Sequence, residues 1–68
     1  MRKVYKAVST YDDGSQDEAT VVITSEGDIF QVAWEISNGE KDRAVLEASS
    51  IDEAFELWCE ENDFKPAG

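Results

Sequence analysis

Large apolar side chains occupy every second position of the segment 28–37 (DIFQVAWEIS), and this pattern constrains the fold more than any other feature. Successive side chains of a β-strand point to opposite faces, so Phe30, Val32, Trp34 and Ile36 would share one face. Because an apolar face of this size has to be covered, the segment predicts a sheet with a second layer packed against it.

Three further segments have strand character. Residues 3–11 are rich in β-formers, and residues 19–24 are β-branched. Residues 42–48 follow Asn38-Gly39, a dipeptide that favours a hairpin because both residues tolerate positive φ. A helix over 42–48 is the alternative to a fourth strand. These segments predict an antiparallel meander of three to four strands.

A helix is expected from residue 51 to about Asn62. Ser50 and Glu53 fit a capping box, in which each side chain bonds the backbone N–H of the other. The expected apolar stripe consists of Ile51, Phe55, Trp58 and Asn62, with Ala54 beside it. The fold class predicted for this chain is therefore α+β, a single domain over residues 1–68 with one C-terminal helix packed on one face of the sheet.

Composition narrows the class of protein and its partners. The 68 residues carry sixteen acids and six bases, a net charge of -10. So acidic a chain is a poor ligand for DNA, RNA or an anionic membrane, which basic patches bind. With one cysteine and no apolar leader after Met1, we expect a cytoplasmic protein, either a monomer or a weak homodimer.

The residue types that support catalysis are scarce. The chain has no histidine, the commonest general base and transition-metal ligand, so Cys59 lacks a partner for nucleophilic catalysis. Cys59 lies beside the apolar stripe, and we expect it to be partly buried as a small apolar residue. No pair among the sixteen carboxylates stands out, and no glycine-rich phosphate loop is present. We expect no enzymatic activity, no cofactor and no dedicated metal site.

One loop partly matches a calcium-binding pattern. Asp13, Ser15 and Asp17 have the spacing of the first ligands of an EF-hand loop. The match then fails, because Glu18 stands where the glycine belongs and Thr24 stands where the bidentate glutamate belongs. The loop is interpreted as a solvated turn, with weak cation binding as the alternative.

The acids are unevenly distributed along the chain. Eight acids and no base lie between Ala7 and Glu40, counting Glu40 itself, and the predicted helix carries acids at each turn without a single base. Like charges spaced four residues apart destabilise a helix slightly, so this array suggests a role in association. The candidate partner-binding residues are Asp12, Asp13, Asp17, Glu18, Glu26, Asp28, Asp52, Glu56, Glu60 and Asp63.

In length, in its base-free acidic stretch and in its acidic helix, the chain resembles small phage-encoded inhibitors of the DNA-mimic and anti-CRISPR classes. The resemblance implies a non-enzymatic inhibitor that binds a basic nucleic-acid-binding protein, such as a Cas effector subunit, in the host cytoplasm. The alternative is a small acidic interaction module of the immunity or antitoxin type, or a homodimer, that does not use mimicry. In that alternative Tyr5 and Tyr11 would supply apolar contacts.

Overall fold

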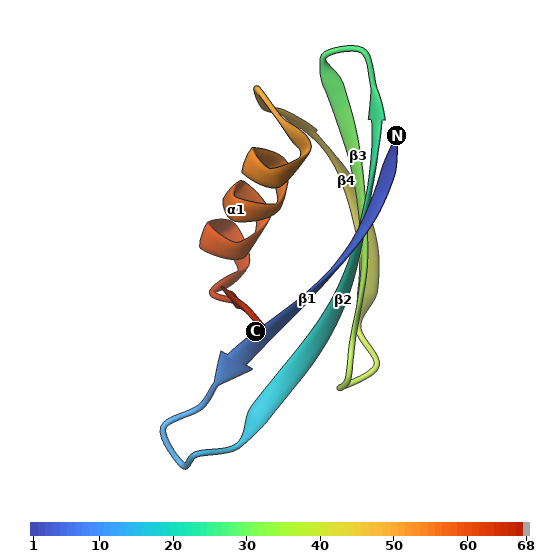
Figure 1. Cartoon of the computed structure of the whole chain (residues 1–68). Coiled ribbons are helices and arrows are strands. Elements are labelled where there is room, and N and C mark those ends of the chain that lie inside the picture. The colour runs from blue at the N-terminus through green and yellow to red at the C-terminus, as the bar shows by residue number, and fades with distance from the viewer. Residues whose placement is uncertain (68) are drawn as a thin grey trace.

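A computed structural model describes residues 1–67 as a twisted antiparallel sheet with one helix across it (Figure 1). The elements are β1 (Arg2–Thr10), β2 (Gln16–Glu26), β3 (Ile29–Ile36), β4 (Lys41–Glu47), α1 (Ile51–Asn62) and β5 (Lys65–Pro66). The strand order is β4-β3-β2-β1-β5, and every neighbouring pair is antiparallel.

The predicted α+β class and the helix on one face are confirmed, but the sheet has five strands instead of three to four. The additional strand, β5, pairs with Ala7 and Val8 of β1 after the chain turns back from α1. Two residues are too short to show a period of two, which is why the pattern did not reveal it. The segment predicted as 42–48 is a strand, shifted by one residue to Lys41–Glu47, and its helical alternative is wrong.

The core lies between α1 and the face of the sheet that carries Phe30, Val32 and Ile36. Phe55 of α1 stacks on Tyr5 of β1 with ring centroids 4.2 Å apart. This contact removes Tyr5 from the set of exposed aromatic anchors. The buried residues are Ala7, Ala19, Val21, Ile23, Phe30, Val32, Ile36, Ala54, Phe55, Trp58 and Cys59.

Trp58 anchors the second half of the helix. Its ring lies 5.6 Å from that of Trp34 and 5.2 Å from that of Phe64, centroid to centroid. The side chain is 2% exposed, and its Nε1 has no hydrogen-bond partner in residues 1–67. Burial of apolar area, without a polar contact, therefore holds this end of α1 on the sheet.

The hairpins depend on glycines at positive φ. Asn38-Gly39 forms the predicted hairpin between β3 and β4, and within it only Gly39 adopts positive φ, at 98°. The Gly39 N–H donates to the Ile36 carbonyl, which gives a turn with a bulge at the glycine. The Asn38 side chain accepts from the N–H of Glu40, which adds a second hydrogen bond within the turn.

The two ends of α1 are closed differently. At the start, the Ser50 hydroxyl accepts from the Glu53 N–H, as expected, but the Glu53 carboxylate accepts from Ser49 instead of Ser50. At the end, Asp63 takes a left-handed conformation with φ 61° and ψ 38°. The N–H of Phe64 then donates to the carbonyl of Cys59, the arrangement of a Schellman motif.

Candidate protein-binding surfaces

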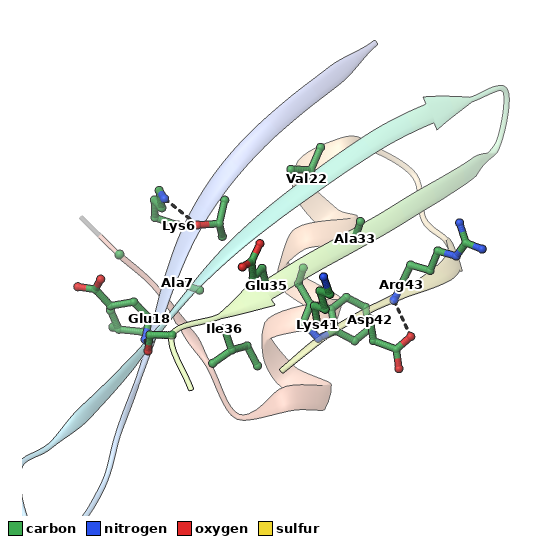
Figure 2. Close-up of a pocket in the computed structure, with 15 residues that line it drawn as sticks. Lys6, Ala7, Glu18, Val22, Ala33, Glu35, Ile36, Lys41, Asp42 and Arg43 are labelled. Carbon is green, nitrogen blue, oxygen red and sulfur yellow. Dashed lines mark hydrogen bonds between the residues drawn. The ribbon is translucent and has the colours of Figure 1, made fainter. Parts of the chain in front are cut away.

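The face of the sheet opposite α1 is open, and most of the bases lie there. Directly paired residues of neighbouring strands point to one face, so the registers assign each side chain to a side. Figure 2 views this face with α1 behind the strands. Its charged side chains are Arg2, Lys6, Lys41, Arg43 and Lys65 among the bases, and Glu18, Glu26, Glu35 and Glu47 among the acids.

Charge is therefore segregated between the open face and the rest of the molecule. Five of the six bases and four of the sixteen acids lie on the open face, which makes it nearly neutral. The remainder, comprising the helix side and the turns, holds twelve acids and one base, Lys3. This second surface has a net charge of -11, so it accounts for the negative charge of the molecule, and a basic partner would be attracted to it.

The open face also has an apolar floor. Val22 and Ala33 line a shallow hollow of about 1000 Å³, rimmed by Lys6, Glu35 and Arg43 (Figure 2). The Lys6 ammonium donates to the Thr20 hydroxyl at 2.7 Å. An antiparallel sheet often leaves one face to solvent, and such a face mixes short apolar and polar side chains as this one does.

Within residues 1–67 a single ion pair forms, and it ties the start of α1 to β1. The Lys3 ammonium lies 2.9 Å from a carboxylate oxygen of Asp52, and the Tyr5 hydroxyl donates to the same oxygen. The hydrogen bond from Tyr5, and after it the bond from Lys3, lowers the pKa of Asp52. Of the predicted partner-binding residues, Asp52 is thus the one whose charge is already neutralised within the molecule.

The second half of α1, taken as Glu56 to the C-cap Asp63, carries acids that form no ion pair within the described residues. Glu56, Glu60, Glu61 and Asp63 are all exposed, and the last turn of the helix holds no base. The carbonyl groups at a helix C-terminus carry partial negative charge, so these acids raise the local negative potential. Glu61 belongs to this group by position, although the candidate set chosen from the sequence did not include it.

The predicted partner-binding residues do not form one patch. Asp12, Asp13 and Asp17 lie at one end of the β1–β2 hairpin, which projects past α1, whereas Glu26 and Asp28 lie at the opposite end of β2 (Figure 1). The molecule measures 41 Å along its longest axis, and these two groups of acids lie toward opposite ends of it. Glu18 and Glu26 point to the open face. The helix group is Asp52, Glu56, Glu60 and Asp63.

The turn acids that resemble calcium ligands are engaged within the turn. Asp13 accepts from the hydroxyl of Ser15 at 2.6 Å and from its backbone N–H at 2.9 Å, and the hydroxyl bond, and after it the backbone bond, lowers the pKa of Asp13. Asp17 accepts from the hydroxyl of Tyr11. Across residues 1–67, no group of three or more candidate ligands is placed to hold a metal ion.

Cys59 is more deeply buried than expected, with 4% of its surface exposed. Burial, with a smaller effect from the Glu56 carboxylate, raises the pKa of its thiol to about 11. A thiol with this pKa is almost entirely protonated near neutral pH and is a poor nucleophile.

Comparisons with protein-family models, with curated proteins and with solved structures find no match to this chain. In residues 1–67, no helix combines the length and the apolar character required to cross a membrane.

Sequence reasoning missed the gathering of bases on the open face. The five bases lie at positions 2, 6, 41, 43 and 65, and strand register alone brings them together. The available signal was the even spacing of Arg2, just before the predicted strand 3–11, and Lys6 within it, since residues four apart on a strand share a face.

Proposed function

We propose that this protein is a non-enzymatic acidic inhibitor that binds a basic nucleic-acid-binding surface of a partner protein and occupies it in place of nucleic acid. The observation that carries the proposal is the segregation of charge, with twelve acids and one base outside the open face. A neutral solvated surface would mix lysines with these acids, as ordinary helix surfaces do.

The second half of α1 is the centre of the proposed contact. Glu56 and Glu60 lie four residues apart, about 6 Å along the helix axis, and Glu61 and Asp63 extend the array. A regular row of negative charges of this kind resembles the phosphate backbone that basic grooves bind. Electrostatic attraction would speed the encounter and make binding weaken as salt rises.

The finer form of the proposal is an anti-CRISPR or similar phage anti-defence protein acting in the host cytoplasm, with a Cas effector subunit as one candidate partner. It rests on the size and acidity of the chain. A partner whose basic channel holds a nucleic acid duplex offers the matching surface.

The proposal is tested by capture followed by competition. The immobilised chain is incubated with bacterial lysate at low salt, captured proteins are identified, and the partner is purified. We expect duplex DNA or RNA to displace the partner from the chain, and the chain to weaken the partner's binding to nucleic acid in a titration. A partner that binds nucleic acid equally well in excess chain would rule out mimicry.

A second candidate function is an interaction module that uses the open face. Val4 and Val45 are 50% and 64% exposed on that face, and they would supply apolar contacts to a partner. Such binding would persist at high salt and would be insensitive to neutralisation of the helix acids. The salt dependence of capture therefore separates the two candidates.

A further inference from the structure

We propose that two copies of this protein pair edge to edge through β4, in an antiparallel register centred on Val45. The inference concerns a different part of the molecule from the acidic helix, and it holds or fails independently of the proposed function.

The outer edge of β4 is unpaired along its whole length. β4 ends the strand order on one side, whereas on the other side β5 pairs with part of β1. The Arg43 N–H points away from β3, because it donates to its neighbour Asp42 at 2.8 Å. Alternate residues of a strand share this direction, so the backbone groups of Val45 and Glu47 also point outward. A row of such groups is a template for another strand.

The apolar layer is incompletely covered at this edge. Val45 is 64% exposed, and Ala44 and Leu46 are half-buried because α1 packs mainly on β2. Trp34, which pairs with Asp42 in the neighbouring strand, is also half-buried. A strand added beside β4 would cover apolar surface on both faces of the sheet at once.

The sequence of β4 is complementary to itself in one register. With Val45 on the two-fold axis, Arg43 of each copy lies opposite Glu47 of the other, and Ala44 lies opposite Leu46. Oppositely charged and apolar cross-strand pairs both stabilise a sheet. A register centred on Arg43 would place two guanidinium groups together, and one centred on Ala44 would place Asp42 opposite Leu46. The charged side chains of β4 therefore disfavour the other two registers and favour the register centred on Val45.

Charge repulsion between the copies is small at this distance. In the paired sheet, the two β2 strands, over which the helices lie, are five strand spacings apart, about 24 Å. The Debye length at physiological salt is about 8 Å, so the acids of the two helices are screened from each other. Both helices lie on the same side of the joined sheet, which would place two acidic surfaces side by side.

The first test is sedimentation equilibrium of the full chain from about 20 µM to about 1 mM, because a single strand pair is a small interface and binds weakly. We expect the average mass to rise from monomer toward dimer with concentration. Val45→Lys places like charges on the two-fold axis and is expected to lower the association constant about tenfold. Val4→Lys, an equally open-faced control in β1, is expected to leave it within about twofold.

The second test fixes the register. Glu47→Arg is expected to weaken association, and Arg43→Glu/Glu47→Arg to restore it, because the exchange preserves the Arg43–Glu47 pair. In a register centred on Ala44 the same exchange would bring Lys41 opposite an arginine and would not restore association. A wild-type chain that stays monomeric throughout, equal effects of Val45→Lys and Val4→Lys, or failure of the exchange to restore dimers would overturn the proposal.

Discussion

The first and last turns of α1 are both negatively charged, and the contrast between them separates acids that stabilise the fold from acids that do not. At the start, Asp52 and Glu53 face the positive end of the helix dipole, and each has hydrogen-bond partners. At the end, Glu60 and Glu61 face the negative end, and the last turn contains no base. Acids retained where they oppose stability are candidates for a role in binding.

The same contrast appears in the backbone. Ser50 is a favoured N-cap in an ordinary extended conformation, whereas Asp63 occupies the left-handed position that glycine usually fills. The left-handed conformation costs a residue other than glycine roughly 1 kcal/mol. The C-terminal end of α1 therefore carries unfavourable charge and unfavourable backbone conformation in the same few residues.

Loss of the N-cap of α1 is expected to have the largest effect on the free energy of unfolding. Ser50→Ala removes the acceptor for the Glu53 N–H and should lower the free energy of unfolding by about 1 kcal/mol. Chemical denaturation would measure this loss as a lower midpoint, with the dependence of the unfolding free energy on denaturant unchanged. Ser9→Ala, a serine of β1 whose hydroxyl makes no hydrogen bond within the described residues, is the control for general loss of a hydroxyl. An unchanged midpoint for Ser50→Ala would mean that the cap does not hold the helix.

Removing the strained residue at the C-terminal end of α1 is expected to stabilise the protein. Asp63→Gly removes the strain of the left-handed residue and one opposing charge, and should raise the free energy of unfolding by about 1 kcal/mol. Asp63→Asn keeps a side chain that tolerates the conformation and removes the charge, so it should give a smaller gain. If both variants were less stable than the wild type, Asp63 would be stabilising α1 after all.

The Asp52 contacts should make stability at the first turn depend on pH. Because the folded chain lowers the pKa of Asp52, the stabilisation is present above the unfolded value of about 3.9 and is lost as pH falls through the folded value. Asp52→Asn should therefore destabilise the protein at neutral pH, by less than loss of the cap because the ion pair is solvent-exposed. Thermal unfolding of both proteins from pH 7 to pH 2 would show the difference shrinking. A difference that stays constant across this range would contradict the role of the charge.

The smallest effect is expected from reversing one charge near the end of the helix. Glu61→Lys should raise the free energy of unfolding by about 0.5 kcal/mol at low salt, because a cation suits the C-terminal end of the dipole. The gain should decrease when salt is added. Glu26→Lys, on the open face of β2, provides a charge-matched control outside both the helix and the proposed β4 edge. A gain in stability equal to that of Glu61→Lys would show that net charge, and not the helix dipole, causes the effect.

Much of this fold could be predicted from local patterns. The alternation around Val32, the Asn38-Gly39 turn and the Ser50 cap each have a short-range physical cause, and each marks an element that the structure contains. The start of β2 was missed because Gln16 to Glu18 lie in the part of the hairpin that projects beyond α1. Without a core to cover, that part has no apolar alternation.

The surfaces were less predictable than the elements. Asp52 could not be recognised as neutralised, because Lys3 and Tyr5 are more than forty residues away in sequence and reach it only when α1 packs on β1. Glu18 was grouped with Asp17, its neighbour, although adjacent residues of a strand point to opposite faces. The packing of α1 on β1 decides the pairing of Asp52, and strand register decides the face on which Glu18 lies.

The most direct test of the proposed function compares two variants of equal net charge. Glu56→Gln/Glu60→Gln/Glu61→Gln neutralises the second half of α1, and Asp12→Asn/Asp28→Asn/Glu40→Gln neutralises three acids in turns; each variant has three fewer negative charges. We expect the helix variant to bind the captured partner at least about tenfold more weakly than the wild type, with no loss of stability, and the turn variant to stay within about threefold. Equal weakening by the two variants would show that net charge alone governs binding, and would contradict the helix as the recognition surface.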